Sequence, residues 1–361
     1  MHPADAGDPP VALETLRDAV PARCFRPSTA RSLLHLGLDL VLLAALTAAS
    51  TRVEGAAWHA PLVFLQGTLF WSLFVIGHDC GHGAFSRRPG WNTAVGHALH
   101  TPLLVPYHAW RLSHRTHHRH AGDVERDEAW PPLTRTQLRA ASPAARFLRL
   151  RAFPLVFPFY LVRNGPARAG SHFDADGPLF RDADRPAVRR SVAACAAMVA
   201  LLALAAWQLG LAVVARHWLA PWLVFCVWAA VVTYLHHTDA RIPWYRGAGW
   251  SHLRGALATV DRRYGAFERL HHDAGCHVVH HLFPRIPHYR LREAARAVEP
   301  LLGAHYRRAD AGVVRSLWDA ARRCQVVPEE GERVGYEPLV PDAASAWAAP
   351  PRGAGSSPAT R

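Results

Sequence analysis

The chain has 361 residues, of which 50% are hydrophobic and 19% charged, enough for one large domain or two small ones. All 41 Lys and Arg residues are Arg, and with 28 acidic residues they give a net charge of +13. Six cysteines lie scattered along the chain, at positions 24, 80, 195, 226, 276 and 324. With no C-x-x-C pair among them, a disulfide framework and a zinc ribbon are disfavoured. The 24 histidines are the anomaly, because neither a packed core nor a phosphate-binding surface needs so many.

Four apolar blocks are long enough to cross a membrane. Residues 33–50 contain one acidic residue, Asp39, and residues 60–77, 191–215 and 218–235 contain no Arg or acidic residue. At about 1.5 Å per residue, such blocks match a hydrocarbon core of about 30 Å. The alternative, four buried helices of a soluble protein, would need a very large core. We therefore expect an all-α membrane protein with four transmembrane helices.

Arginine placement predicts the topology. Short connections join the first block to the second and the third to the fourth, which makes two hairpins, and these connections hold only Arg52 and Arg216. The positive-inside rule then places both termini and the middle region in the cytoplasm. The net charge follows from this orientation, and we expect no nucleic-acid partner. The expected organisation is a cytoplasmic segment 1–30, a membrane domain 31–325 and a disordered tail 326–361.

The histidines form three clusters outside the spans. They begin at His78 (HDCGH), at His114 (HRTHH) and at His277 (HVVHH). On a helix, residues at i, i+3 and i+4 share a face, so each cluster can direct its imidazoles to one point. Together they offer eight side chains on the expected cytoplasmic side: His78, His82, His114, His117, His118, His277, His280 and His281.

Eight imidazoles favour two metal ions with open coordination positions, since a structural zinc needs only four ligands. The rival chemistry is hydrolysis at a zinc-bound water. A zincin motif would carry Glu second in H-E-x-x-H, and here that position is Asp79, either a base or a group that orients a ligand. A non-enzymatic metal or haem carrier would place its histidines along a span, whereas most lie outside. The leading hypothesis is therefore a membrane-embedded enzyme with a His-rich di-metal cap.

Several stretches resemble the integral-membrane fatty acid desaturases, specifically the acyl-lipid, omega-3-type branch. The matching stretches are GHDCGHGAFS at 77–86, PYHAWRLSHRTHHRHAGDVERDEAW at 106–130, YLHHTDARIPWYR at 234–246, LRGALATVDRRYG at 253–265 and HHDAGCHVVHHLFPRIPHYRL at 271–291. The resemblance runs over roughly residues 12–325. It implies two irons that activate dioxygen and remove two hydrogens from an acyl chain.

The resemblance also distributes the ligands. It assigns one iron to His78, His82, His114, His118 and His281, and the other to His117, His277, His280 and a ninth histidine, His237. The residues alone do not choose between His237 and its neighbour His236. Family-like positions expected to support or pack around the ligands are His97, His100, His108, His271 and His272. Asp123, Glu125, Asp127 and Glu128 either orient ligands or form a solvated charge run, and whether Asp261 holds an Arg or a His stays open.

Substrate and electrons must come from outside the chain. An acyl chain has no polar group near its middle, so a narrow apolar tunnel must position it. The sequence has no His-Pro-Gly-Gly haem segment, no cysteine set for an iron–sulfur cluster and no G-x-G-x-x-G after a strand. The resemblance thus implies ferredoxin or a cytochrome-b-class haem protein as donor. It implies conversion of linoleoyl to alpha-linolenoyl lipid; a linoleate-forming desaturase, a hydroxylase and a zinc-dependent membrane hydrolase stay open as alternatives.

Overall fold

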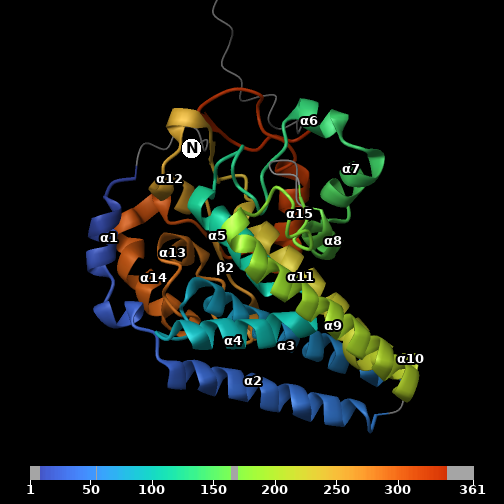
Figure 1. Ribbon diagram of the computed structural model, residues 1–361. Helices are drawn as coiled ribbons and strands as arrows, with labels where there is room; N and C mark the ends of the chain where they lie inside the picture. Colours follow the sequence, from blue (N-terminus) through green and yellow to red (C-terminus); the bar gives the residue numbers. More distant parts are fainter. Residues whose placement is uncertain (1–8, 54, 164–169, 340–361) are drawn as a thin grey trace, which may run out of the picture.

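The computed structural model describes residues 9–53, 55–163 and 170–339 (Figure 1). In this part of the chain the fold consists of helices and two small two-stranded sheets. The helices up to the middle of the chain are α1 (Leu13–Ala19), α2 (Thr29–Ser50), α3 (Ala56–His82), α4 (Pro89–His100), α5 (Tyr107–His120), α6 (Arg135–Ala140), α7 (Pro143–Leu150) and α8 (Val156–Val162). They are followed by α9 (Arg185–Leu209), α10 (Leu211–Val214), α11 (Ala220–His237), α12 (His252–Ala256), α13 (His277–Leu282), α14 (His288–Leu302) and α15 (Val313–Arg323).

Four helical segments of the described chain are long and apolar enough to cross a membrane, as expected. They span Thr29–Ser50, His59–His82, Asp182–Leu209 and Leu211–His237. The third segment ends at Leu209 rather than at 215, because Gly210 adopts a positive φ of 93° that interrupts the helix. The second and fourth continue beyond their expected ends, so their last turns carry histidines.

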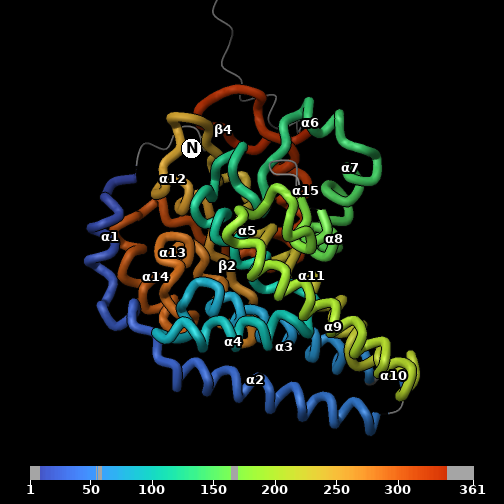
Figure 2. The backbone as a smooth tube through the Cα atoms, in the orientation of Figure 1, coloured from blue at the N-terminus to red at the C-terminus, as the bar shows by residue number. Residues whose placement is uncertain are grey.

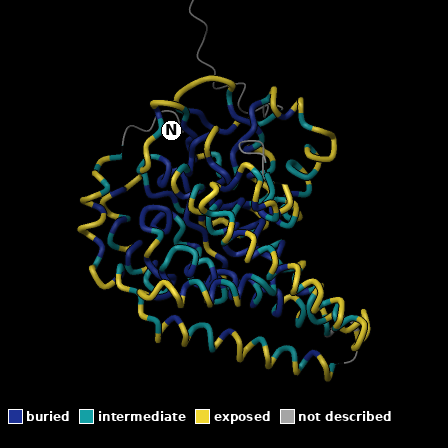
Figure 3. The backbone as a smooth tube through the Cα atoms, in the orientation of Figure 1, coloured by how far each residue is buried: buried dark blue, intermediate teal, exposed yellow. Residues whose placement is uncertain are grey.

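The long helices differ in how far the protein covers them. α3 packs along α11, with α2 and α4 against its other sides. In contrast, α2 exposes large apolar side chains between positions 33 and 42, and α9 does so between 199 and 209; Figure 3 shows many exposed residues on both helices. Val41 is 67% exposed, Leu201 58% and Trp207 78%. Apolar surface of this extent is unusual on a soluble protein and fits contact with lipid.

Residues 238–339, which we call the cap, lie beside the C-terminal ends of α3 and α11. The N-terminal segment packs on the cap, with α1 running next to α14 (Figure 2). Leu16 belongs to the same buried apolar cluster as Val278, Ile286 and Val298. This cluster surrounds α13 and therefore fixes the helix that carries the third group of histidines.

The cap extends beyond residue 325, where we expected a disordered tail. β4 (Arg333–Val334) pairs antiparallel with β1 (Trp244–Tyr245), while β2 (Asp261–Arg262) pairs in parallel with β3 (Arg308–Ala309). Val326 and Val327 are buried, and the Tyr336 hydroxyl donates a hydrogen bond of 3.4 Å to the carbonyl oxygen of His237. The expectation is therefore wrong for residues 326–339. The polar composition of this stretch suggested disorder, although a few of its apolar residues are buried. Residues 340–361 lie outside the described part.

Candidate metal centre

Four helices bring the nine predicted histidines together. α3 carries His78 and His82 on its last turns, and α11 ends at His237. α5 carries His114, His117 and His118, and α13 carries His277, His280 and His281. The spacing i, i+3, i+4 places the imidazoles of each helix on the side that faces the other helices. Segments about 200 residues apart in sequence thus converge on one region.

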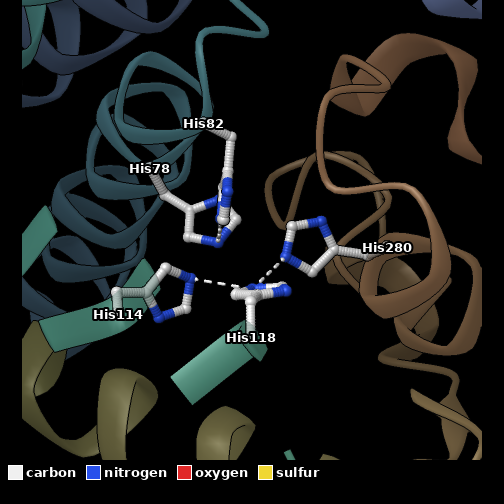
Figure 4. Close-up of side chains that lie close together, drawn as sticks. All are labelled: His78, His82, His114, His118 and His280. Atoms are coloured by element: carbon white, nitrogen blue, oxygen red, sulfur yellow. Dashed lines mark hydrogen bonds between the residues drawn. The ribbon is translucent and has the colours of Figure 1, made fainter. Parts of the chain in front are cut away.

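The first group of histidines draws on three helices. Ring nitrogens of His78, His82, His114, His118 and His280 all lie within 4.8 Å of one another. The Nε2 atoms are 3.2 Å apart in His78 and His82, 3.1 Å in His114 and His118, and 3.1 Å in His118 and His280. Figure 4 shows these five rings directed toward a common point between α3, α5 and α13.

The second group lies next to the first. Ring nitrogens of His117, His237 and His281 lie within 4.8 Å of one another. His277 joins them, because its Nε2 atom is 3.0 Å from that of His237 and 3.1 Å from that of His281. The rings of His118 and His281 stack at 4.1 Å between centroids, so the two groups are in direct contact.

One assignment by resemblance is reversed. We expected His281 in the first group and His280 in the second, and the structure places His280 in the first and His281 in the second. The reason is how α13 is rotated against α3 and α5, because His280 is turned by about 100° from His281 on the helix. His280 therefore faces α3 and the side of α5 that carries His114 and His118.

The donor atoms fit metal binding. A metal–imidazole bond of about 2.0–2.1 Å separates two ligand nitrogens by about 2.9 Å at a right angle and about 3.4 Å at a tetrahedral angle. The Nε2 pairs of both groups, at 3.0–3.2 Å, fall inside this interval. Neutral imidazole is a good ligand for iron, zinc, copper and nickel. Each group thus presents a converging all-nitrogen donor set.

Burial keeps these imidazoles uncharged. Outside the membrane-spanning helices, burial lowers the pKa of His114, His118, His277, His280 and His281 well below the ordinary histidine value, and neighbouring histidines lower each pKa further. A protonated imidazole has no lone pair for a metal. The site therefore presents lone pairs at neutral pH, and protons compete little with a metal cation for them.

A buried carboxylate orients one ligand from behind. Asp127 Oδ1 accepts a hydrogen bond of 2.6 Å from Nδ1 of His117, which leaves Nε2 free for a metal. Asp127 also accepts from the backbone N–H groups of Gly122 and Ala129. The acidic run after the second cluster is thus not simply solvated: Asp127 orients a ligand, Asp123 is buried against Arg126, and Glu125 is exposed.

Two other carboxylates position helices rather than imidazoles of the site. Asp79 Oδ2 accepts from both the backbone N–H and Nδ1 of His288, at 3.0 and 2.8 Å, and so ties α3 to the start of α14. Asp261 accepts from the Val278 N–H at 2.8 Å and from the Tyr306 hydroxyl at 2.5 Å. Asp261 therefore holds the start of α13, which resolves the question that the sequence left open. The sequence analysis did not single out His288. It lies inside a family-like stretch, but outside the H-x-x-H-H pattern that marks the ligands.

Hydrogen bonds distinguish His236 from His237. His236 Nδ1 lies 2.7 Å from the Val260 carbonyl oxygen and Nε2 lies 2.9 Å from the Tyr264 hydroxyl, so both ring nitrogens are engaged. Arg262 donates to the carbonyl oxygens of Leu235 and Thr238 and fixes the end of α11 around His237. The supporting histidines His97, His100, His108 and His271 lie outside both groups; His272 lies in a third cluster considered below.

An apolar cavity opens onto both groups. Its lining comes mainly from α3, α5, α8, α11, α13 and α14 and from the loop that carries His272. Most of its wall is apolar or aromatic, with Trp71, Phe74, Trp110, Phe157 and Ala230 among the lining residues. One end of the wall is formed by imidazoles from both groups, including His78, His114, His117 and His237. The cavity can hold a flexible apolar chain against the metal-binding atoms while keeping bulk water away.

Comparison with known proteins agrees with this geometry. The family model for fatty acid desaturases matches residues 56–311. The chain is 44% identical to the sn-1 acyl-lipid omega-3 desaturase (ferredoxin) of Synechocystis sp. over 91% of both chains. It is 41% identical to the acyl-lipid omega-3 desaturase (cytochrome b5), endoplasmic reticulum, of Arabidopsis thaliana, covering 92% of this chain and 89% of that one. The chain therefore belongs to the fatty acid desaturase family, with the acyl-lipid omega-3 desaturases as its relatives.

Proposed function

We propose that this protein is a di-iron, O2-dependent desaturase that converts linoleoyl to alpha-linolenoyl groups in membrane lipids. The observation that carries the proposal is the apolar cavity whose end wall contains imidazoles of both histidine groups. The reaction removes two hydrogens from adjacent methylenes. O2, two electrons and two protons are consumed with them, and two waters are formed.

The residues of this chain divide the work. The nine histidines would hold two irons, which when bound supply the oxidising chemistry that side chains lack. Phe74, Trp110 and Phe157 form an aromatic wall that binds the acyl chain by shape. Asp127 fixes the ring orientation of His117, and Asp261 fixes the start of α13. The low-polarity cavity excludes water that would compete with the acyl chain for the oxidant.

The position of the new double bond is proposed from the relatives. The Synechocystis and Arabidopsis relatives are named omega-3 desaturases. In the cavity, a chain already bent by cis double bonds must stop with its methyl-end carbons beside the histidine groups. We propose that the shape of the apolar wall, not a polar contact, measures this distance, because the acyl chain has no polar group there.

An external protein supplies the electrons in this proposal. One relative is named for ferredoxin and another for cytochrome b5, so either class of donor is compatible with this scaffold. The net charge of +13 favours association with an acidic partner, at a rate that falls as salt rises. The purified chain should be inactive with O2 and substrate alone, and turnover without a donor would contradict this part.

The membrane arrangement is also a proposal. The four long helices would form two hairpins, with both termini and the cap in the cytoplasm, because arginines are scarce in the two connections. Reporter fusions at residue 9, near Arg135 and at residue 339 test this arrangement. All three reporters should respond as cytoplasmic, and any one on the opposite side of the membrane would overturn it.

Expression in a host supplied with linoleate tests the reaction. We expect an alpha-linolenoyl product by gas chromatography, none with His118→Ala, and two irons per chain in the purified wild type. Linoleate formed from oleate with no trienoic acid would place the protein in the sister activity, and a hydroxy acid would change the reaction class. One zinc, no O2 requirement and ester hydrolysis would instead favour a zinc-dependent hydrolase.

A further inference from the structure

We propose that the chain holds a third metal ion, a divalent ion of the zinc class, in a separate cluster formed by His35, His272 and His288. Ring nitrogens of these three residues lie within 4.8 Å of one another. The residues come from α2, from the loop before α13 and from the start of α14. An ion here would tie the outermost long helix to the cap. The proposal is independent of the reaction proposed above.

The spacing of the three rings resembles that of the two groups already described. Ring centroids of His272 and His288 are 4.5 Å apart and those of His35 and His288 are 4.9 Å apart. Rings that share a group in the metal centre are 4.5–5.0 Å apart in pairs such as His82 and His118, and His117 and His281. The His35 and His272 rings, at 5.8 Å, are the widest pair of the third cluster, so one ring must shift slightly.

Carboxylates hold one nitrogen of each of two of these rings. His272 Nε2 lies 2.7 Å from Asp39 Oδ2, and His288 Nδ1 lies 2.8 Å from Asp79 Oδ2. Each carboxylate accepts the ring N–H and thereby leaves a lone pair on the other nitrogen, as Asp127 does for His117. Nε2 of His288 is buried and has no hydrogen-bond partner in the described structure. An unsatisfied buried acceptor is unfavourable, and a bound cation would remove that penalty.

The local charge also calls for a cation. Asp39 and Asp79 are each 4% exposed, and the ion-pair partners found for them in the described chain are histidines. A single divalent ion bound by the three rings balances both buried carboxylates. Three imidazoles with an open position are a common donor set for Zn²⁺.

The backbone at this cluster is held in an uncommon conformation. His272 and Asp273 have φ values of 48° and 54°, in the left-handed region that side chains other than glycine rarely adopt. This turn brings His272 between α2 and α3, where Asp39 Oδ2 of α2 and Ser72 Oγ of α3 contact it. The surrounding contacts thus place the imidazole at the cluster against the local backbone preference.

Metal analysis of the purified full-length chain tests the third site, with elemental quantification of iron and zinc per chain. We expect one zinc in addition to iron in the wild type, and at least a tenfold loss of that zinc, with iron unchanged, in His35→Phe. Phenylalanine keeps a ring against Tyr289, which stacks on His35 with centroids 5.6 Å apart. His35→Cys should retain the zinc, because a thiolate is also a ligand. His252→Phe, an exposed histidine outside the three clusters, is the matched control.

Several outcomes would overturn the proposal. Zinc absent from the wild type, or zinc unchanged in His35→Phe, would show that Asp39 and Asp79 are balanced by protons or that zinc occupies the other histidine groups. Loss of zinc in His35→Cys as well as in His35→Phe would show that a ligand at position 35 is not the cause. If His35→Phe does not fold, Asp39→Asn gives the same comparison with little change of shape, and an undiminished zinc content there would count against the site.

Discussion

Asp127 Oδ1 lies 2.6 Å from Nδ1 of His117, and both side chains are almost completely buried. The carboxylate is itself held by the backbone N–H groups of Gly122 and Ala129. The second histidine group is therefore oriented by a short turn that directly follows α5. This turn links the sequence after the second cluster to the metal centre.

Removing this carboxylate should weaken metal binding without unfolding the protein. We expect Asp127→Asn to lower iron affinity or activity by about 10–100-fold, the usual range for a partner that orients a metal-binding histidine. Iron content after dialysis against a weak chelator and fatty-acid product formation measure the two effects. Glu125→Gln, an exposed carboxylate in the same run, is the control. Equal iron retention in both variants would show that Asp127 does not support metal binding.

The neighbours His236 and His237 should separate in mutagenesis. His237→Ala removes an Nε2 atom that lies 3.2 and 3.0 Å from those of His117 and His277, so we expect loss of activity and of part of the iron. His236→Ala breaks hydrogen bonds to Val260 and Tyr264 and should cost about 1–3 kcal/mol of stability, with iron retained. Iron content and thermal unfolding distinguish them. An inactive His236 variant beside an active His237 variant would reverse the assignment.

The other eight histidines of the two groups should each be required for activity. Their conversion to Ala should abolish product while the protein still inserts in the membrane, because each removes one converging donor. His120→Ala is the comparison, since His120 lies on α5 outside the groups. Membrane content by immunoblot and product by gas chromatography check both points. Full activity in any of the eight would show that the residue is not needed for a metal.

A larger side chain in the cavity should block substrate but spare the metals. Ala230 on α11 is 3% exposed and lines the cavity, so Ala230→Leu inserts three carbons where the acyl chain would lie. We expect at least a tenfold loss of product with iron content unchanged. Leu201→Phe, which enlarges an exposed side chain on α9, should leave product formation unaffected. Iron loss in Ala230→Leu would show that the change distorts the metal centre instead of filling the cavity.

Local patterns predicted most of the architecture and the site. Apolar blocks with at most one charge indicated the four long helices, and the i, i+3, i+4 spacing indicated which faces carry ligands. The partition of His280 and His281 was wrong, because it depends on how α13 is rotated against α3 and α5, which is a tertiary property. Two interpretations of Asp127, as a group that orients a ligand or as a solvated charge, stayed open for the same reason. The sequence pattern could not choose between a solvated carboxylate and one enclosed by the turn after α5.

Long-range contacts account for the remaining misses. Tyr336 reaches the carbonyl oxygen of His237, 99 residues earlier, from a polar stretch that has no periodic pattern. In the sequence Asp39 is notable only as the single charge in an apolar block, yet it pairs with His272, 233 residues later. Each case is a polar group whose partner is distant in sequence, and neither composition nor spacing carries that information.

Asp261 should give the protein a measurable pH dependence of stability. Burial raises the pKa of its carboxyl from 3.8 to about 6. Because the folded state binds this proton more tightly than the unfolded state, the stabilisation is complete below pH 3.8 and is lost as pH rises through about 6. The loss is about 3 kcal/mol, by linkage. Buried histidines with lowered pKa act in the opposite direction, so wild type must be compared with a variant.

Asp261→Asn isolates this contribution, because the amide oxygen still accepts from the Val278 N–H but the side chain no longer titrates. Thermal unfolding of both proteins should be measured between pH 4.5 and 7.5. We expect the stability of the variant relative to wild type to increase with pH, most steeply near about pH 5, midway between the two pKa values, and to level off above about pH 6. Glu299→Gln, which removes a partly exposed ion pair with Arg308, should show no such step. A pH-independent difference between wild type and Asp261→Asn would mean that Asp261 does not titrate in this range.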